Sequence, residues 1–328
     1  MSNKIQALFK SANPIECMQI LNGGVYISPT MKCNAQCRHC VANNIRKMSA
    51  DASEEDVLEW IDQIHECGIQ GVHFVGGEPF VVRQSLNKYI KKLNELDMFA
   101  GVVTNGLWAK TVEEGIAVLE EMPGLDLLII SSDKYHLEYI DASIVKNAIE
   151  AGLATGKFVV INVTYVESSE VKEINQIYKE YRDKILIQSV KAMPFDGEDS
   201  QKIKRSQLFK TPSKVPAYCG IGNYFVDNNG SVSACCQSSR SKNTKCLYLG
   251  NMKEKRLLEL HRSFKSRDIY RFFKKYGPRG LVEIFLQSDF SNELIDKQYT
   301  SACEICKEIL DDREKLDYFL SHIKERLD

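Results

Sequence analysis

The segment GVYISPTMKCNAQCRHC, residues 24–40, joins a short apolar run to a loop that holds three cysteines. The apolar run predicts a strand, and Cys33, Cys37 and Cys40 follow it with the spacing C-x3-C-x2-C. Three thiolates brought to one point can hold an iron–sulfur cluster with one iron left open. From the spacing alone, a zinc site completed by His39 fits about as well.

The order of strand and helix then repeats along the first two thirds of the chain. Further runs rich in β-branched and aromatic residues predict strands at 71–79, 99–106, 125–133, 157–165 and 185–190. Helical patterns separate them at 53–68, 85–96, 112–122, 142–153 and 171–182. Such alternation predicts an α/β protein with parallel strands joined by right-handed crossovers. A partial (β/α)6 TIM-like barrel fits, and a doubly wound open sheet fits nearly as well from periodicity.

Polar segments fall where the predicted strands end. They are the cysteine loop, Gly76–Pro79, Thr104–Gly106 and Ser131–Asp133. In a barrel or an open parallel sheet, the carboxyl ends of the strands face the ligand. We therefore expect these four segments to converge.

The pattern changes after about residue 191. The runs NYFV and SVSA flank Asp-Asn-Asn-Gly, which predicts a β-hairpin bracketed by Cys219 and Cys235. Helical sequence follows, and Cys303 and Cys306 open a terminal helix. We expect an N-terminal extension over residues 1–21 and the barrel over 22–195. A small α+β module of hairpin and helices is expected over 196–328.

Composition narrows the class of protein. The chain has 328 residues, a formal net charge of −1 and 11 cysteines. A balanced charge argues against a general nucleic-acid binder. Neither a signal peptide nor a membrane-spanning apolar run is evident, so we expect a cytoplasmic protein without a membrane partner. In that compartment, clustered cysteines indicate metal ligation or redox chemistry rather than disulfides.

The two motifs of the first region occur together in one family. C-x3-C-x2-C after a first strand, followed by Gly-Gly-Glu-Pro after a second, resembles the radical S-adenosylmethionine (radical SAM) enzymes over roughly residues 22–190. The resemblance implies a 4Fe-4S cluster on the three loop cysteines, with the amino and carboxylate groups of SAM chelating the open iron. It implies that the methionine amino group is held by a turn made of Gly76, Gly77, Glu78 and Pro79.

The later cysteines resemble an auxiliary-cluster module called SPASM when it is long and twitch when it is short. The pattern is Cys219-x10-Gly230-x4-Cys235, then Cys303-x2-Cys306. The resemblance implies that these four cysteines ligate a second 4Fe-4S cluster. A four-cysteine zinc knuckle is the alternative. The further cysteines of the longer form are absent apart from Cys246, so the short form is expected.

The remaining cysteines differ in their settings. Cys17 and Cys67 lie in or near apolar helical sequence and are expected to be buried thiols. Cys246 has no assigned role. Cys236 directly follows Cys235, and adjacent residues of an extended arm point to opposite sides. If Cys235 faces a cluster, Cys236 faces the substrate and could donate a hydrogen atom; an inert packed cysteine is the alternative.

A closer resemblance extends through most of the chain. The segments TNGLW, SSDKYH, CGIGNYFVDNNGSVSACC, RDIYRFFKKYG and SACEIC occur in that order. Together they resemble the radical SAM epimerases that convert L-residues to D-residues in ribosomally made peptides of the epipeptide type. In those enzymes a cysteine beside an auxiliary-cluster ligand donates hydrogen, and Cys236 occupies that place. The relatives carry an acidic residue where this chain has Asn223, which leaves a different C–H chemistry open.

The resemblance implies a reaction sequence and its partners. A flavodoxin- or ferredoxin-type donor reduces the first cluster, SAM is cleaved to methionine and a 5′-deoxyadenosyl radical, and this radical takes a Cα hydrogen from the precursor peptide. Cys236 then returns hydrogen from the opposite face. At the strand ends, Ser131, Asp133 and Asn162 are expected to bond the SAM ribose. Tyr135 and His136 either line the substrate side or pack in the protein.

Two other functions also fit the sequence. One is another radical SAM reaction: a thioether or carbon–carbon crosslink in a peptide, or dehydrogenation of an alcohol. The other, more distant, is a non-catalytic iron–sulfur or zinc protein.

Overall fold

The computed structural model describes residues 23–40, 50–192, 215–217, 219–235, 244–297, 299 and 301–327. The chain divides into two compact units. The first comprises Met1–Val190 and Val226–Gly230, and the second Lys191–Phe225 and Ser231–Asp328. The N-terminal extension and the boundary expected after residue 195 lie outside the described residues.

The first unit is built on strands that stand side by side in the order in which the chain makes them. These strands are β1 (Val25–Thr30), β2 (Gly71–Gly76), β3 (Phe99–Thr104), β4 (Leu127–Ser131), β5 (Phe158–Tyr165) and β6 (Leu186–Lys191). Each pair from β1 to β5 is parallel. A doubly wound sheet reverses its strand order at a switch point, whereas this order runs on without reversal. The fold is therefore an α/β partial barrel of the TIM type.

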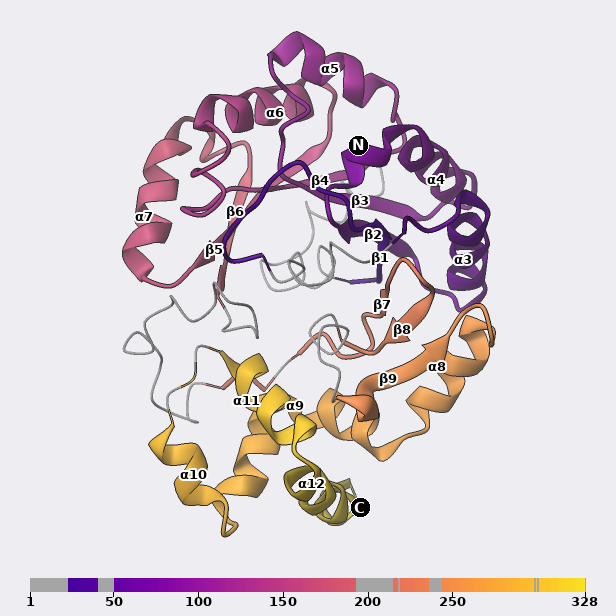
Figure 1. The fold of residues 1–328 in the computed structure, drawn as a ribbon, viewed down its shortest axis with the longest axis vertical. Coiled ribbons are helices and arrows are strands. Elements are labelled where there is room, and N and C mark those ends of the chain that lie inside the picture. The colour runs from indigo at the N-terminus through magenta and orange to yellow at the C-terminus, as the bar shows by residue number, and fades with distance from the viewer. Residues whose placement is uncertain are drawn as a thin grey trace. The chain divides into compact units, whose positions relative to one another are not determined.

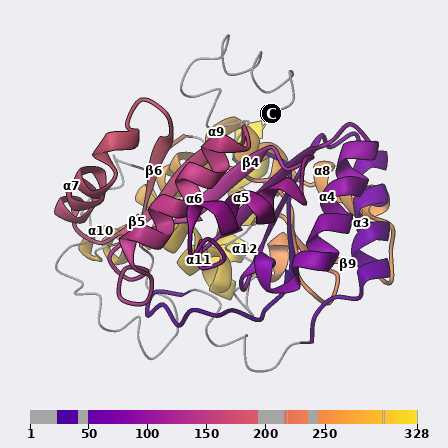
Figure 2. The same ribbon diagram turned by 90° about the horizontal axis from the view of Figure 1, so that it is seen from above.

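Helices connect the strands and cover one face of the sheet (Figures 1 and 2). They are α3 (Glu54–Glu66), α4 (Arg83–Glu95), α5 (Val112–Glu120), α6 (Ala142–Ala154) and α7 (Ser168–Ile177). Short 3-10 turns, η1 (Pro79–Val82) and η2 (Lys179–Tyr181), follow β2 and α7.

Local sequence explains the ends of two helices. The Ser53 hydroxyl accepts a hydrogen bond from the Asp56 amide at 3.1 Å, which confirms Ser53 as the N-cap of α3. Helix α7 begins at Ser168, earlier than the predicted residue 171. The Glu170 side chain, in its first turn, accepts a hydrogen bond from the Val166 amide at 2.9 Å and so fixes the earlier start.

The strands are buried on both faces. Leu127, Ile129 and Val160 form one cluster of buried side chains. On the other face, a Cβ placed on Gly152 of α6 would lie 2.7 Å from Val159 and 3.2 Å from Leu128. Helix α6 therefore packs closely on β4 and β5, and near-continuous apolar sequence is needed in these strands.

The second unit combines a small antiparallel sheet with helices. Strand β8 (Ser231–Ser233) follows the short β7 (Phe225–Val226) and pairs antiparallel with β9 (Tyr248–Asn251). The predicted hairpin turn between β7 and β8 belongs to the first unit. In it, Gly230 has φ 89°, and the Asp227 side chain accepts from the Asn229 amide at 3.0 Å.

The helices of this unit are α8 (Leu257–Lys265), α9 (Asp268–Leu286), α10 (Ser291–Asp296), α11 (Ala302–Asp311) and α12 (Arg313–Leu327). Helix α9 kinks at Gly277, which precedes Pro278. The Phe319 ring of α12 lies 5.1 Å from that of Phe272 and 5.9 Å from that of Phe273, which packs α12 on α9. Among the described residues, no helix is both long and apolar enough to cross a bilayer.

Candidate functional site

The three-cysteine loop begins where β1 ends. Cys37 is 4% exposed, while Cys33 and Cys40 are half-buried. The Cys40 amide donates to the Cys37 carbonyl at 3.0 Å, which closes a turn between the second and third cysteines. The Cys33 sulfur accepts from the Ala35 amide at 3.5 Å and from Asn105 Nδ2 at 3.8 Å. A residue at the end of β3 thus contacts the loop that follows β1.

The Gly-Gly-Glu-Pro turn packs directly on the start of this loop. Gly76 has φ 115°, and a Cβ there would lie 2.0 Å from the Ser28 hydroxyl. A Cβ on Gly77 would lie 2.0 Å from the Lys32 carbonyl oxygen, to which the Glu78 amide donates at 2.7 Å. Only glycine permits so close an approach of two backbones.

Glu78 fixes the turn from within. It is 2% exposed, and its Oε2 accepts from the Asn105 amide at 2.7 Å. Its Oε1 accepts from the Thr104 hydroxyl at 2.7 Å and from the Phe80 amide at 3.1 Å. Burial raises the pKa of Glu78 to about 7, although these hydrogen bonds oppose the rise. Glu78 thereby joins the ends of β2 and β3, and Pro79 opens the 3-10 turn η1.

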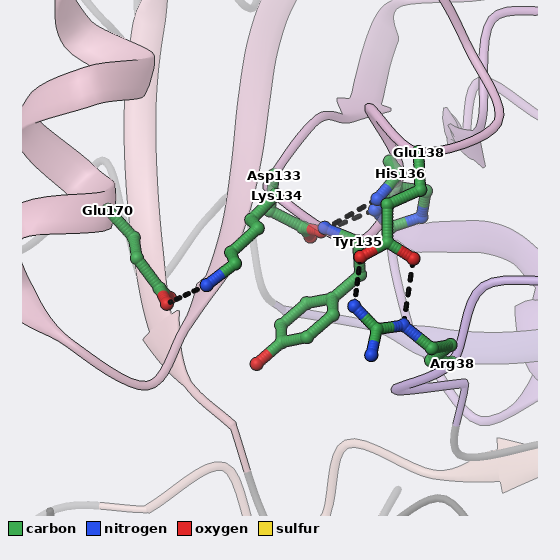
Figure 3. A network of polar contacts seen from close by, with 7 residues as sticks. All are labelled: Arg38, Asp133, Lys134, Tyr135, His136, Glu138 and Glu170. Atoms are coloured by element: carbon green, nitrogen blue, oxygen red, sulfur yellow. Dashed lines mark hydrogen bonds and ion pairs between the residues drawn. The ribbon is translucent and has the colours of Figure 1, made fainter. Parts of the chain in front are cut away.

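The segment after β4 is organised by a buried carboxylate. Asp133 is 1% exposed, and its Oδ1 accepts from the amides of Tyr135 and His136 at 2.9 and 3.1 Å. Its Oδ2 lies 2.9 Å from His136 Nδ1 and accepts from the Thr164 amide at 3.2 Å. Figure 3 shows the Asp133–His136 contact. Asp133 thus has an internal partner on each oxygen, and its expected bond to the SAM ribose stays a prediction.

Two histidines converge on this carboxylate. His39 Nε2 lies 3.5 Å from Asp133 Oδ2, and its ring stacks on Tyr135 with centroids 4.7 Å apart. Burial alone would lower the pKa of His136, but its hydrogen bond to Asp133 and its electrostatic interaction with Cys37 raise that pKa to about 10. His136, which the sequence left between a substrate-lining and a packing role, therefore lies beside a cysteine of the loop.

An ion pair joins the same two segments near the surface. The Arg38 guanidinium donates to the Glu138 carboxylate through two nitrogens, Nε to Oε2 at 2.8 Å and Nη2 to Oε1 (Figure 3). The Arg38 guanidinium also lies 5.9 Å from the centroid of the Tyr135 ring. Farther along, Lys134 pairs with Glu170 of α7 at 3.4 Å. The Arg38 contacts orient the segment after β4 relative to the cysteine loop, and the Lys134–Glu170 pair ties that segment to α7.

The other expected SAM-binding residues lie on neighbouring strands. Ser131 of β4 stands opposite Asn162 of β5 in the parallel register. Asn162 Oδ1 accepts from Gln188 Nε2 of β6 at 3.1 Å, so polar side chains continue across three strands. Thr104–Gly106 meets Gly76–Pro79 as expected, but the sequence did not single out Asn105 or Gln188. The only sequence signal for these two residues was that each is polar and lies at or near the end of a predicted strand.

In the second unit, backbone hydrogen bonds link the segments that carry cysteines. The Gly222 amide, shortly after Cys219, donates to the Ala234 carbonyl at 3.1 Å. The Ala234 amide donates to the Leu247 carbonyl at 2.8 Å, beside Cys246 in η7 (Lys245–Leu247). Cys219, Cys235 and Cys246 are therefore carried by connected segments.

In the same unit, the charges of the four predicted auxiliary ligands influence one another's pKa. These ligands are Cys219, Cys235, Cys303 and Cys306. Cys303 lies in the first turn of α11, where a helix N-terminus favours thiolates, and Cys306 begins the second turn. Desolvation, followed by the charges of Cys235, Cys303, Cys219 and Cys246, holds the pKa of Cys306 far above its ordinary value. Desolvation likewise raises the pKa of Cys219 to about 11 and that of Cys303 to about 12. Thiols crowded in this way fit a group that binds them as thiolates.

Some predicted residues lie outside the part of the chain that the structure describes: Cys17 and Cys236. Asn223, which stands where the epimerases carry an acid, is half-buried in the turn after Cys219. Its amide donates to the Gly220 carbonyl at 2.9 Å.

Family models match both parts of the chain. The radical SAM superfamily model matches residues 27–155, and the SPASM iron–sulfur cluster-binding domain matches residues 218–308. The first match includes the cysteine loop, the Gly-Gly-Glu-Pro turn and Ser131. The second includes the four clustered cysteines and Cys246.

Individual relatives match to different extents. YydG of Bacillus subtilis (strain 168), assigned by name to peptide biosynthesis, is 22% identical over 315 residues, covering 93% of this chain and 97% of YydG. GTP 3′,8-cyclase of Syntrophomonas wolfei is 36% identical over 132 residues, 38% of this chain and 40% of the cyclase. PqqA peptide cyclase of Gluconobacter oxydans is 29% identical over 126 residues, 38% of this chain and 30% of the cyclase.

The matches determine the cofactors. A radical SAM domain implies a 4Fe-4S cluster with SAM, and a SPASM domain indicates an auxiliary iron–sulfur cluster. The loop of Cys33, Cys37 and Cys40 beside a two-glycine cradle fits the first, and the clustered thiols of the second unit fit the other. The chain thus combines a radical SAM domain with a SPASM iron–sulfur cluster-binding domain.

Proposed function

We propose that this protein inverts one residue of a ribosomally made peptide from the L to the D configuration. The match to a protein named for peptide biosynthesis spans nearly all of both chains. PqqA peptide cyclase, another relative, is also named for a peptide substrate. The substrate class is therefore a ribosomal precursor peptide, and the L-to-D assignment rests on the epimerase-like segments of the sequence.

The observation that carries the proposal is the position of Cys235. Its charge contributes to the raised pKa of both Cys303 and Cys306, so Cys235 belongs with the auxiliary thiols. Its neighbour Cys236 is then not needed as a cluster ligand, and its thiol can serve as the hydrogen donor. A thiol S–H bond is weak enough to give a hydrogen atom to a carbon radical.

The cofactors and the chain have separate tasks. Cys33, Cys37 and Cys40 hold the first cluster, Gly76–Pro79 holds the methionine end of SAM, and Ser131 and Asn162 bond its ribose. When bound, cluster and SAM supply a carbon radical that takes a hydrogen atom from an unactivated C–H bond. The barrel positions the peptide Cα and excludes water.

Inversion needs hydrogen from the opposite face. Cys236 gives its S–H hydrogen atom to the planar Cα, which forms the new C–H bond and leaves a sulfur-centred radical. One electron and one proton restore the thiol. The auxiliary cluster, which Cys219, Cys235, Cys303 and Cys306 would hold, would supply electron-transfer chemistry. The electron would come from an external donor of the flavodoxin or ferredoxin class, and the proton from solvent.

The test uses candidate precursor peptides, each incubated with the enzyme anaerobically in deuterated water with SAM and reductant. Epimerisation adds one deuterium at Cα without other mass change, and chiral analysis after hydrolysis finds one D-residue. A crosslink of the kind that PqqA peptide cyclase suggests, or a dehydrogenation, removes two hydrogens instead. A loss of two hydrogens would show that the enzyme crosslinks or dehydrogenates its substrate and does not epimerise it. Absence of SAM cleavage would favour a non-catalytic iron–sulfur or zinc protein.

A substitution at Cys236 tests whether this residue is the hydrogen donor, independently of whether the protein is a radical SAM enzyme. We expect Cys236→Ala to keep cleaving SAM in the presence of peptide but to form no D-residue. Cys67→Ala, which removes a thiol that follows α3, serves as the matched control and is expected to epimerise normally. D-residue formation by Cys236→Ala would refute the donor assignment.

A further inference from the structure

The outer side of α9 carries a cluster of positive charge. Residues 262–275 hold six Lys and Arg side chains against one acid, Asp268, a formal charge of +5 in a chain whose net charge is −1. The apolar side of α9 is buried, and cations occupy the opposite side at positions that the helical period brings together. We call these cations the basic face: Arg267, Arg271, Lys274 and Lys275.

Aromatic rings hold cations of the basic face in place. The Arg267 guanidinium lies 5.7 Å from the centroid of the Phe264 ring, and Lys274 Nζ lies 5.9 Å from that of the Tyr270 ring. A long side chain that is already ordered loses less rotamer freedom when a partner binds. The basic face is therefore prepared for a partner of opposite charge.

The basic face also lies against the segment that follows the first auxiliary cysteine. A Cβ placed on Gly222 would lie 3.1 Å from the Tyr270 ring and 3.9 Å from Cε of Lys274. The Gly222 amide donates to the carbonyl of Ala234, the residue before Cys235. The cations thus stand beside the backbone that carries two of the predicted ligands of the auxiliary cluster.

We propose that the basic face is the docking site of an acidic one-electron carrier protein that reduces the auxiliary cluster. The carrier loses one electron, the cluster gains it, and no covalent bond changes. Complementary charge steers such partners together and speeds their encounter. Complexes for electron transfer bury little surface, so a few ordered cations on one helix suit them.

A redox protein fits this face better than a nucleic acid or an anionic membrane does. The SPASM domain brings an iron–sulfur cluster to this unit, and a carrier docked on α9 is held near the cysteines that bind it. Neither a nucleic acid nor a membrane gains anything from that proximity. The need for one electron in each turnover rests on the proposed function, in which Cys236 gives up a hydrogen atom.

The first experiment measures anaerobic binding of the holoenzyme to an immobilised flavodoxin and to a 2Fe-2S ferredoxin, each chosen for a net negative charge. We expect binding to at least one carrier, and it should weaken as salt rises, because salt screens exposed charges. Arg271→Glu combined with Lys274→Glu should weaken binding at low salt about tenfold, since each reversal replaces an attraction with a repulsion. The neutral pair, Arg271→Gln with Lys274→Gln, should weaken it about threefold.

Lys91→Glu combined with Lys172→Glu is the matched control. Both lysines are exposed in the first unit, on α4 and α7, and their reversal changes the net charge by the same amount. This variant should bind the carrier as the wild-type protein does. Equal weakening in the control, unchanged binding after reversal of Arg271 and Lys274, or no binding of either carrier would overturn the proposal.

Duplex DNA and vesicles of anionic phospholipid are tested in the same way at physiological salt. The wild-type holoenzyme should bind neither more tightly than it binds the carrier. Tighter binding of DNA or vesicles that is lost when Arg271 and Lys274 are reversed would assign the basic face to that partner and overturn the proposal.

Stopped-flow mixing of the reduced carrier with the oxidised holoenzyme follows the electron itself. Its second-order rate constant should fall about tenfold when Arg271 and Lys274 are reversed, in parallel with binding. SAM cleavage driven by dithionite needs no docking and should be unchanged, which shows that the variant is folded and loaded. A failure of docking would leave epimerisation with dithionite untouched, and a crosslinked product would leave the docking site untouched.

Discussion

The backbone amide of Asn105 donates a hydrogen bond to the buried Glu78 carboxylate at 2.7 Å. This contact joins the turn after β2 to the end of β3, although 27 residues separate the two in sequence. The Asn105 side chain then reaches Asn34 Oδ1 at 2.7 Å and the Cys33 sulfur at 3.8 Å. Glu78 therefore holds in place a residue that contacts the cysteine loop, in addition to shaping its own turn.

Glu78 gives the protein a pH-dependent stability. Burial raises its pKa from 4.5 to about 7, so between these values the native state keeps a proton that the unfolded chain releases. Stability contributed by this group therefore falls as pH rises through that window, with a slope of at most about 1.4 kcal/mol per pH unit, and is level above it. We expect Glu78→Gln to flatten this slope in thermal unfolding measured from pH 5 to pH 8.

The control for that measurement is Glu120→Gln, because Glu120 is exposed at the end of α5. It should keep the wild-type slope. A Glu78→Gln variant with an unaltered slope would show that Glu78 is not the group responsible.

Gly76 is predicted to tolerate no side chain. Its φ is 115°, and an added Cβ would lie 2.0 Å from the Ser28 hydroxyl and 2.5 Å from the Thr30 carbonyl oxygen. We expect Gly76→Ala to lose about 3–5 kcal/mol of stability, from backbone strain and overpacking together. Because the turn abuts the cysteine loop, iron bound after reconstitution should fall as well.

Gly68→Ala is the matched comparison for the clash at Gly76. Gly68 also has a positive φ, 70°, but a Cβ there meets nothing within 4 Å. It should cost only about 1–2 kcal/mol and leave iron binding intact. Equal losses in the two variants, measured by thermal unfolding, would refute the packing argument.

The assignment of the auxiliary ligands predicts iron stoichiometry. With two 4Fe-4S clusters the chain binds about eight irons, and Cys303→Ala with Cys306→Ala should reduce this to about four. The spectral response of the first cluster to SAM should persist. Cys246→Ala, which removes a neighbouring thiol outside the predicted set, should still bind about eight. Loss of about four irons from Cys246→Ala would place that residue among the ligands.

Ser131 and Asn162 are predicted to contribute to SAM affinity. Each removed hydrogen bond costs about 1 kcal/mol, so Ser131→Ala and Asn162→Ala should each weaken SAM binding about fivefold. Anaerobic equilibrium dialysis with labelled SAM measures this directly. Ser169→Ala, at an exposed position of α7, should bind SAM normally. Unchanged affinity in both site variants would remove these residues from the ribose contact.

Much of the first unit was predictable because its signals are local. The N-cap at Ser53, the strand runs and the glycine-rich turn after β2 follow from short stretches of sequence. The cysteine spacing and the Gly-Gly-Glu-Pro turn indicated the radical SAM family, which the family match bears out. The internal partners of Asp133 were not predictable, because a carboxylate at a strand end looks the same whether it faces a ligand or is bound by Tyr135 and His136.

The sequence alone determined the alternation of strands and helices, the three-cysteine loop and the two groups of cysteines with their family. Only the tertiary structure decided between a barrel and a doubly wound sheet, because apolar periodicity reports burial and not which strands pair. It alone placed Asn105 beside Cys33 and His136 beside Cys37. Such contacts join residues far apart in the chain, and only closure of the sheet brings them together.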